Sequence, residues 1–350
     1  MNKFNNEVAV NYADAGVSLE RADKAMKGVK KSVRSTFNEG VVGDVGNFGG
    51  LFSLQHLNMK DPILVSSVDG VGTKLKVHFG LKSHSQAGQD IVNHCVDDIL
   101  VQGARPLFFL DYLATGRLEE GVLEGVVEGM AQACRENACV LIGGETAEMP
   151  GFYTQGEYDI AGTIVGVVER DLVIDGKDIK PGTKVLGLLS SGLHTNGYSL
   201  ARKALFEVGG YKLDSKVEGM DLTVGEALAV PHRSYLDVLI DLVEAKKIQG
   251  LVHITGSGFQ GNIPRILPEG VDVTVDRTAW EVPKIFQLIQ EAGGIEKDEM
   301  YNVFNMGVGM LVFVDPDLED EVRSALQAKG ETVIDIGAVE AGTGQVKFLD

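Results

Sequence analysis

The segment from Leu107 to Ala114 constrains the fold more than any other feature of this sequence. Its side chains are apolar on both of the faces that alternate along an extended strand, with Asp111 as the exception. Such a strand needs cover on both sides, because apolar side chains that point in opposite directions must each be shielded from water. We therefore expect a sheet with helices on one face and a partner on the other.

Short apolar runs and longer helical patterns alternate through the rest of the chain. The first half predicts strands at 63–68, 107–114, 140–142 and 163–168, with helices near 89–102 and 119–136. The second half predicts strands at 185–189, 271–275, 308–314 and 333–339, with helices near 197–208, 235–245, 282–292 and 318–328. These elements indicate the α/β (α+β) class, with two mixed α/β domains. Periodicity does not fix the strand order.

The two halves are separated by the stretch from Glu169 to Gly182, which fits neither the strand period nor the helix period. Its aspartates, glycines and Pro181 are typical of a connection. We therefore predict one domain over residues 1–170 and a second over residues 171–350. Both have material for a core, since hydrophobic residues make up 44% of the chain.

The composition excludes several classes of protein. A formal net charge of −18 argues against a nucleic-acid partner, which basic patches would bind. No apolar run reaches the roughly 18 residues of a membrane span, and the start MNKFNNEVAV lacks the apolar stretch of a secretory signal. We expect a cytoplasmic protein without membrane contact. Cys95, Cys134 and Cys139 fit apolar positions and are expected to be reduced core residues.

A glycine turn, DGVGTK, follows the first predicted strand. Gly70 and Gly72 let the backbone approach an anion, and Thr73 offers a hydroxyl. Lys74 supplies a cation, and Asp69 can hold a metal ion that bridges phosphates. The spacing is not that of a P-loop, and a plain turn that closes a strand is the alternative.

The predicted helix 89–102 has an apolar stripe on one side and Asp90, His94, Asp97 and Asp98 on the other. His94 lies four residues from both Asp90 and Asp98, so three potential metal ligands share one ridge. Neighbours on a helix diverge by about 100°, so Asp97 and Asp98 cannot both point at one ion. The alternative is a solvated acidic face, because most helix charges face water.

Carboxylates also follow the predicted strand 140–142. Glu145 and Glu148 lie in the sequence GGETAEMPG, at the strand end where α/β folds build their sites. The alternative is a capped helix that begins at Thr146 and runs to Met149.

Two further loops combine glycine with polar side chains. SSGLHTNGYS follows a predicted strand and contains His194 and Asn196, although a lone histidine is usually structural. In HITGSGFQGNIPRILP a strand leads into the loop Thr255 to Gly258 and then into a short helix. The loop amides suit a phosphate that Asn262 and Arg265 could also reach, and a simple strand-to-helix turn is the alternative.

Taken in this order, the segments resemble the phosphoribosylformylglycinamidine cyclo-ligase family, also called aminoimidazole ribonucleotide synthetases. The matching sequences are NYADAGV from Asn11, DGVGTK, DDILVQGARPLFFLDYLATG, GGETAEMPG, SSGLHTNGYSL, GFQGNIPRILP and FNMGVGM. They span nearly the whole chain. A wider superfamily shares the first of these motifs. LFFLDYLATG and NGYSL indicate the cyclo-ligase family within that superfamily.

The resemblance implies a homodimer whose amino-terminal, ATP-binding domains join their sheets into an intersubunit β-barrel. It also implies that the glycine-rich stretch 43–50 closes over ATP. The implied nucleotide and phosphate set is Lys30, Gly70, Gly72, Thr73, Lys74, Asn196, Thr255, Gly256 and Gly258. The implied Mg²⁺ ligands are Asp69, Asp98 and Glu145, and the expected catalytic residues are His194, Lys74 and Asp69.

The family reaction converts formylglycinamidine ribonucleotide into 5-aminoimidazole ribonucleotide in purine biosynthesis. ATP phosphorylates the formyl oxygen, the amidine nitrogen attacks, and phosphate leaves as the ring closes. This chemistry needs positioning and charge neutralisation rather than a nucleophilic side chain. His194 is the expected proton-transfer group, and the Thr255 to Gly258 loop is the expected cradle for the substrate phosphate.

Three positions depart from the family pattern: Asp97 replaces a usual asparagine, Leu193 a common proline and Ser257 a common glycine. None of these changes removes a charged or ligating group. One rival is another superfamily enzyme, such as thiamine-monophosphate kinase, selenophosphate synthetase or the hydrogenase-maturation dehydratase. Selenophosphate synthetase would require a cysteine near the amino terminus, and the dehydratase would require one at the carboxy terminus. The first cysteine here is Cys95, and the last residue is Asp350. The other rival is a nucleotide-binding subunit that regulates a partner without catalysis.

Overall fold

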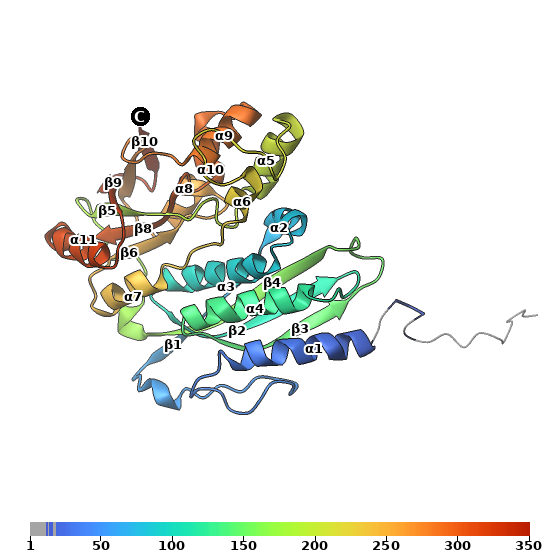
Figure 1. Ribbon diagram of the computed structural model, residues 1–350. Helices are drawn as coiled ribbons and strands as arrows, with labels where there is room; N and C mark the ends of the chain where they lie inside the picture. The colour runs from blue at the N-terminus through green and yellow to red at the C-terminus, as the bar shows by residue number, and fades with distance from the viewer. Residues whose placement is uncertain (1–11, 13, 17–18) are drawn as a thin grey trace, which may run out of the picture.

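A computed structural model describes residues 12, 14–16 and 19–350 of the chain. Two sheets, each accompanied by helices, lie one above the other (Figure 1). Of the NYADAGV motif, Asn11, Ala13 and Val17 lie outside the described residues.

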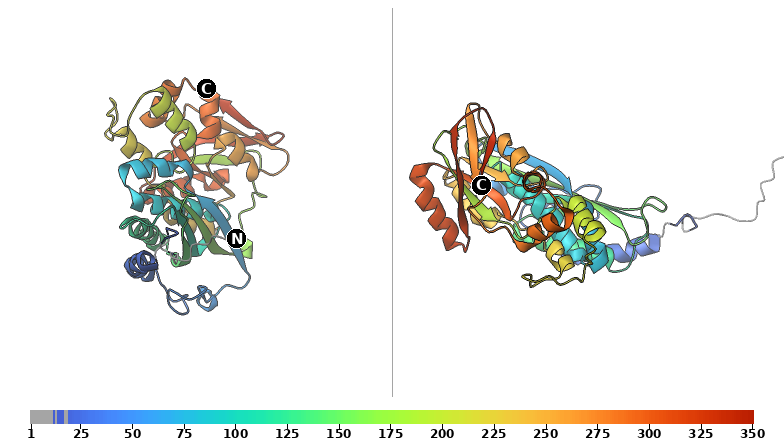
Figure 2. Two further views of the ribbon diagram at one scale, coloured as in Figure 1. Left: turned by 90° about the vertical axis from the view of Figure 1, so that its right-hand side faces the viewer. Right: turned by 90° about the horizontal axis from the view of Figure 1, so that it is seen from above.

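The amino-terminal half builds a four-stranded sheet in the order β1-β4-β2-β3. Its elements are α1 (Leu19–Arg34), β1 (Pro62–Gly70), α2 (Leu75–Leu81), α3 (His84–Leu100), β2 (Arg105–Thr115), α4 (Val122–Glu136), β3 (Val140–Glu148) and β4 (Tyr158–Glu169). α3 and α4 cover one face of the sheet, and α1 packs against α4 (Figures 1 and 2). Glycine lets α3 and α4 touch, because a Cβ on Gly129 would lie 1.9 Å from the carbonyl oxygen of Ser85.

The opposite face of this sheet, here called the open face, is only partly covered. Loop residues before β1 reach it, and the Phe52 ring contacts Phe108 of β2 with ring centroids 5.4 Å apart. Leu64, Val68 and Tyr112 remain exposed. The helix cover predicted for residues 107–114 is confirmed, and cover of the open face by a partner stays a prediction.

The carboxy-terminal half builds a six-stranded sheet in the order β10-β7-β9-β5-β8-β6. Its elements are β5 (Lys184–Leu189), α5 (Tyr198–Arg202), α6 (Val224–Ala229), α7 (Leu236–Glu244), β6 (Gly250–His253), α8 (Gly258–Asn262), β7 (Val271–Asp276), α9 (Lys284–Gly293), α10 (Lys297–Val303), β8 (Val308–Val314), α11 (Glu319–Ala328), β9 (Val333–Ala341) and β10 (Val346–Leu349). Every residue of β8 is buried, in keeping with its uninterrupted apolar sequence.

Each predicted strand and helix is present, although several differ in extent; α3 and β4, for example, each begin five residues before the predicted start. β3 continues to Glu148, so the alternative of a helix that begins at Thr146 is wrong. The predicted helix 197–208 divides into α5 and a π-helical turn, Lys203–Val208. The helices α1 and α2 were not predicted, and neither were the short elements α6, α10 and β10.

The sheets separate at the predicted domain boundary, but the hydrophobic core continues across it. Ile99 and Leu100 of α3 belong to one buried cluster with Leu186 of β5 and Leu239 of α7. α3 is therefore the element through which the halves pack, and the boundary after residue 170 stays a prediction.

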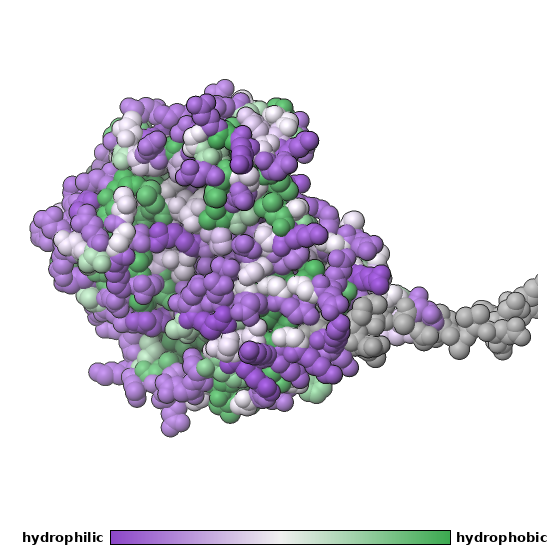
Figure 3. Space-filling model, in the orientation of Figure 1, coloured by the Kyte–Doolittle hydropathy of each residue, from purple (hydrophilic) through white to green (hydrophobic). Residues whose placement is uncertain are grey.

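The remaining expectations concern the surface and the cysteines. The face in Figure 3 is predominantly hydrophilic, with hydrophobic residues in separate groups. No helix in the described part of the chain is both long and apolar enough to cross a membrane. Cys95, Cys134 and Cys139 are free and buried, which confirms their prediction as core residues.

Candidate functional site

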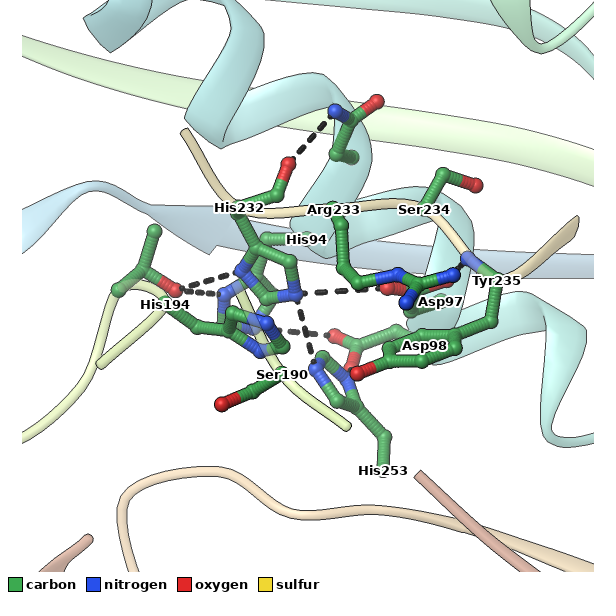
Figure 4. A network of polar contacts seen from close by, with 12 residues as sticks. His94, Asp97, Asp98, Ser190, His194, His232, Arg233, Ser234, Tyr235 and His253 are labelled. Carbon is green, nitrogen blue, oxygen red and sulfur yellow. Dashed lines mark hydrogen bonds and ion pairs between the residues drawn. The ribbon is translucent and has the colours of Figure 1, made fainter. Parts of the chain in front are cut away.

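The predicted site residues lie in two separate regions. The first, here called the junction cluster, lies where α3 meets the carboxy-terminal half. Its members are Asp69, which contacts His94, and six residues labelled in Figure 4: His94, Asp97, Asp98, His194, His232 and His253. The second, here called the lysine cavity, has a volume of about 370 Å³, and its lining includes Lys30, Asp44, Gly46, Gly49, Gly50, Asp111 and Glu145.

α3 supplies the acidic side of the junction cluster. Its polar residues do not form a solvated face, because Asp90, His94 and Asp97 are buried between the halves. Asp90 does not share a ligand ridge with His94 and Asp98 either. Its carboxylate lies 2.7 Å from the Lys74 ammonium and accepts the backbone N–H of His232. Asp90 and Asp98 therefore serve different partners.

Lys74 is not placed to bind a phosphate, which corrects its predicted role. Its ammonium group is buried and lies 2.7 Å from Asp90 Oδ1, from the His194 carbonyl oxygen and from the Val230 carbonyl oxygen. These contacts use all of the ammonium donors. Burial lowers the pKa of Lys74, and the charge of Asp90 opposes that shift. Lys74 instead ties the glycine turn to the carboxy-terminal half.

The rest of the DGVGTK turn also contacts the carboxy-terminal half. The hydroxyls of Thr73 and Ser199 are 2.9 Å apart. Gly72 has a φ of +64°, which glycine adopts without strain. The Asp69 carboxylate accepts the N–H of Gly70, and its side chain is 42% exposed. Asp69 is therefore the charged group of this turn that a ligand can reach.

His94 links Asp69 to the loop that contains His194. Its Nε2 lies 2.9 Å from Asp69 Oδ2, and its Nδ1 contacts the Thr195 hydroxyl. Burial disfavours the charged ring, but the hydrogen bond to Asp69 and the charge of Asp98 raise the pKa of His94 overall. His94 therefore connects the Asp69 carboxylate to the Thr195 hydroxyl.

Two further histidines continue this chain of hydrogen bonds from Thr195 to Asp98. Thr195 Oγ1 lies 3.2 Å from His232 Nδ1, and His232 Nε2 lies 3.1 Å from His253 Nε2. His253 Nδ1 in turn lies 3.0 Å from Asp98 Oδ1. Burial lowers the pKa of both His232 and His253, so both rings are neutral and each link has one donor and one acceptor.

Two buried polar atoms of the junction cluster have no hydrogen-bond partner in the described residues: His194 Nδ1 and Asp97 Oδ2. His194 is 1% exposed, and its ring stacks on that of His232 with centroids 4.0 Å apart. Burial holds the pKa of His194 well below its ordinary value. The expected proton-transfer residue is therefore a neutral imidazole enclosed by protein.

Asp97 and Asp98 point in different directions. Asp97 is fully buried, its Oδ1 accepts the backbone N–H of Tyr235 at 2.8 Å, and burial raises its pKa well above the ordinary value. Asp98 is 24% exposed. Burial alone would raise the pKa of Asp98, but the hydrogen bond from His253 and the charge of His94 lower it. Asp98 is thus the ionised and accessible acid of the pair.

A cavity of about 680 Å³, here called the junction cavity, opens beside this acid. Its lining includes Asp98, His253, Thr255, Asn262 and Arg265. Arg265 makes no ion pair with any described residue, so its charge is available to an anion. The cavity has the carboxylate, the histidine and the cation that a phosphorylated substrate would require.

The Thr255 to Gly258 loop is close-packed. The Thr255 hydroxyl donates to Asn262 at 3.0 Å. Gly258 has a φ of +53°, and a Cβ there would lie 2.0 Å from the Tyr301 carbonyl oxygen. Asn196 lies against the loop, since a Cβ on Gly256 would be 3.4 Å from its Nδ2. The structure therefore brings these predicted phosphate residues together.

The lysine cavity joins Lys30 of α1 to the glycine-rich stretch 43–50. Neither Lys30 nor Glu145 has an ion pair with a described residue. Asp111, the polar exception of β2, lies so close to Gly144 that a Cβ there would be 2.0 Å from its Oδ1. Burial, with the charge of Glu145, raises the pKa of Asp111 to about 7.

Within one chain, Glu145 lies too far from Asp69 and Asp98 to bind the same metal ion. This corrects the predicted set of Mg²⁺ ligands. The strand order places Asp69 on one edge strand and Glu145 on the other. Adjacent strands lie about 4.8 Å apart, so the two edges are about 14 Å apart. Glu145 pairs with Tyr112, an exposed residue of the open face.

The sequence analysis missed two histidines of the junction cluster. His253 ends β6 immediately before the glycine loop, a position where α/β folds place functional groups, so a signal was present. His232 lies in the irregular segment between α6 and α7 and had no such signal.

Comparisons with known proteins define the class. The family model described as AIR synthase related protein, N-terminal domain, matches residues 55–168, and its C-terminal counterpart matches residues 180–349. Thiamine-monophosphate kinase from Stenotrophomonas maltophilia K279a shares the fold, with a TM-score of 0.69 and 16% identity over 92% of this chain and 95% of that one. Hydrogenase maturation protein HypE in complex with ATP has a TM-score of 0.67 and 19% identity over 93% and 90%. The fold is that of the AIR synthase related proteins.

Closer relatives narrow this class. The phosphoribosylformylglycinamidine cyclo-ligase of Alkaliphilus metalliredigens is 50% identical over 337 residues, or 96% of this chain and 97% of the relative. That of Geotalea daltonii is 48% identical over 343 residues, or 97% and 99%. The chain belongs to the phosphoribosylformylglycinamidine cyclo-ligase family.

Proposed function

We propose that this protein converts formylglycinamidine ribonucleotide and ATP into 5-aminoimidazole ribonucleotide, ADP and phosphate, in de novo purine biosynthesis. The observation that carries the proposal is the 50% identity to a cyclo-ligase over 96% of the chain. The site supports it, because each of the two cavities contains a basic residue without an ion pair to a described residue, Lys30 in one and Arg265 in the other.

The reaction asks the protein to position atoms and neutralise charge. Phosphorylation turns the formyl oxygen into a leaving group, and the amidine nitrogen of the same molecule attacks that carbon. Phosphate departs with the former formyl oxygen as the ring closes. Ring closure is intramolecular, so holding the nitrogen near the carbon supplies much of the acceleration. Arg265 and the Thr255 to Gly258 loop are the proposed holders of the substrate phosphate.

The proton released on ring closure needs an acceptor. His253 lines the junction cavity, is neutral, and continues into the hydrogen-bond chain through His232 and Thr195. His194 lies behind it, stacked on His232. We therefore propose His253 as the group that meets the proton and His194 as the residue that positions His232.

Asp69 and Asp98 fit a magnesium ion. Both are partly exposed carboxylates, and both face the same nitrogen of His94, at 2.9 and 3.7 Å. Mg²⁺ prefers oxygen ligands and keeps several waters, which this accessible edge allows. When bound, the ion would neutralise charge on the ATP phosphates.

A homodimer is proposed to complete the site. Leu64, Val68 and Tyr112 leave apolar surface on the open face, and a second copy would cover it by forming an intersubunit β-barrel. Glu145 lies on the same face. In this arrangement the Glu145 of one copy completes the metal set of the other. Light scattering should give twice the chain mass of 37.5 kDa, and a monomer at working concentration would exclude the arrangement.

A cytoplasmic location is part of the proposal, supported by free, buried cysteines. The activity is tested by incubating the protein with ATP, Mg²⁺ and formylglycinamidine ribonucleotide. Formation of 5-aminoimidazole ribonucleotide is expected. Phosphorylation of thiamine monophosphate instead would favour the kinase, and ATP binding without phosphate release would favour a regulatory subunit.

A further inference from the structure

We propose that Asp111 of β2 accepts a hydrogen bond from the exocyclic amino group of adenine when ATP occupies the lysine cavity. This contact selects ATP over nucleotides that have no amino group at that position of the base. The assignment rests on the proposed function, because that function supplies ATP as the ligand. Lys30 and the glycine-rich stretch 43–50 would then contact the phosphates, and Asp111 would recognise the base.

The lysine cavity has two chemically different parts. One wall is formed by buried apolar side chains from α1, α4 and β3: Val33, Leu123, Val127 and Leu141. The rim has the exposed Lys30 and the exposed glycines of the stretch 43–50. The volume of about 370 Å³ is within the roughly 300–1,000 Å³ of small-molecule sites. The flat faces of a purine suit the apolar wall, and an anionic triphosphate suits the rim.

Asp111 is a polar residue on an otherwise apolar face of β2. Side chains alternate along a strand, so Asp111 points to the same face of the sheet as Phe109 and Leu113. Both of these neighbours are fully buried. No other described residue donates a hydrogen bond to the Asp111 carboxyl group, which lines the cavity. A polar group in such surroundings is unfavourable without a partner, and a ligand in the cavity would supply one.

The neighbouring strand is shaped to admit this carboxyl group. Gly144 of β3 lies directly beside Asp111 in the register of the sheet. A Cβ at Gly144 would lie 2.0 Å from Asp111 Oδ1, so any larger residue there would displace the carboxyl group. The pairing of β2 with β3 fixes the backbone of Asp111, and the glycine leaves its side chain room beside the cavity.

The amino group of adenine matches what Asp111 can accept. Burial raises the pKa of Asp111 to about 7, but a carboxyl group keeps an acceptor oxygen whether or not it holds a proton. A purine with hydrogen in place of the amino group would fill the same space and leave Asp111 without a partner. A site that provides a buried hydrogen-bonding group rejects an analogue that cannot use it. The contact therefore contributes specificity for the base.

Calorimetric titration with ATP and with purine riboside 5′-triphosphate, which lacks the amino group, tests the proposal. The wild-type protein should bind ATP at least about tenfold more tightly than the analogue. Asp111→Leu should reduce this preference to within about threefold, whereas Asp111→Asn keeps an acceptor oxygen and should retain it. Lys30→Met is the matched control, because it should weaken both nucleotides by the same factor and leave their ratio unchanged.

A structural role for Asp111 predicts a different result. Asp111→Leu replaces a carboxyl group that has no protein partner with an apolar group of similar size, so the midpoint of thermal unfolding should not fall. A lower midpoint with an unchanged preference for ATP would assign Asp111 to the fold and overturn the proposal. Equal affinity of the wild-type protein for the two nucleotides would also overturn it.

Two further measurements make the test complete. If Asp111→Leu does not fold, Gly144→Ala decides the question, because its Cβ displaces the carboxyl group and a full preference for ATP would then contradict the contact. Formation of 5-aminoimidazole ribonucleotide is measured in the same samples. Selective ATP binding without ring closure would support the contact and refute the proposed function. Ring closure with equal affinity for both nucleotides would do the reverse.

Discussion

The junction cluster and the lysine cavity use charged residues in opposite ways. Around the junction cluster the charges meet partners, as Lys74 meets Asp90 and His94 meets Asp69. In the lysine cavity, Lys30 and Glu145 have no ion pair with a described residue. A buried charge with a partner holds segments together, whereas an accessible charge without one is available to a ligand. We therefore propose that the first region mainly positions segments of the chain and that the second contacts the nucleotide.

Asp98, like Asp69, departs from this contrast, because its carboxylate is paired with a histidine and yet accessible. Asp98→Asn should lower the rate of 5-aminoimidazole ribonucleotide formation at least about 100-fold through lost charge stabilisation. Asp97→Asn should stay within about tenfold of wild type, because Asp97 is buried away from the junction cavity. Initial rates under saturating ATP decide the ranking. The reverse order would show that Asp97 holds the catalytic ion, and nearly equal losses would favour two ions.

Lys74 and Lys30 allow a direct test of the difference between the junction cluster and the lysine cavity. Lys74→Met leaves Asp90 buried without its cation and should lower the free energy of unfolding by about 3–5 kcal/mol. Lys30→Met should change it by no more than about 0.5 kcal/mol, because Lys30 is exposed. It should instead raise KM for ATP at least about tenfold. Urea unfolding and steady-state kinetics give both quantities, and loss of ATP affinity without loss of stability in Lys74→Met would reverse our assignment.

The proposed sharing of one site by two copies predicts complementation. Asp98→Asn and Glu145→Gln chains, each nearly inactive alone, should recover about a quarter of wild-type activity when their subunits are exchanged at equal amounts. Half of the dimers are then mixed, and one of the two sites in each mixed dimer has both acids intact. Activity that stays at the mean of the separate variants would place Asp98 and Glu145 in independent roles.

The smallest expected effect concerns the glycine-rich stretch 43–50. Glycine loses much conformational entropy on ordering, so a ligand is needed to offset that loss. Amide exchange across residues 43–50 should slow when an ATP analogue binds, whereas exchange in β8 should not change. Equal protection with and without the analogue would count against closure over the nucleotide.

The strands and longer helices could be predicted because their periodicity is local. β8 is a continuous apolar run, β2 is apolar from Leu107 to Ala114 apart from Asp111, and α3 has an apolar stripe. Helix geometry also predicted that Asp97 and Asp98 point in different directions. These features depend on residues that are close in sequence.

The rest of the site depends on contacts between distant segments. Lys74 looked like a phosphate ligand because its partners, Asp90 and the carbonyl of Val230, belong to other parts of the chain. Glu145 appeared to belong with Asp69 because strand order was unknown. His232 has no periodic context, and only the packing of α3 against the carboxy-terminal half reveals its neighbours.

The central claim is that the protein phosphorylates the formyl oxygen and then closes the ring. Formylglycinamidine ribonucleotide labelled with ¹⁸O at the formyl group tests it most directly, with ADP, phosphate and 5-aminoimidazole ribonucleotide measured in the same quenched sample. We predict one ADP for each ring closed and transfer of the ¹⁸O label into the released phosphate. Ring closure without ADP, or phosphate free of the label, would contradict the account.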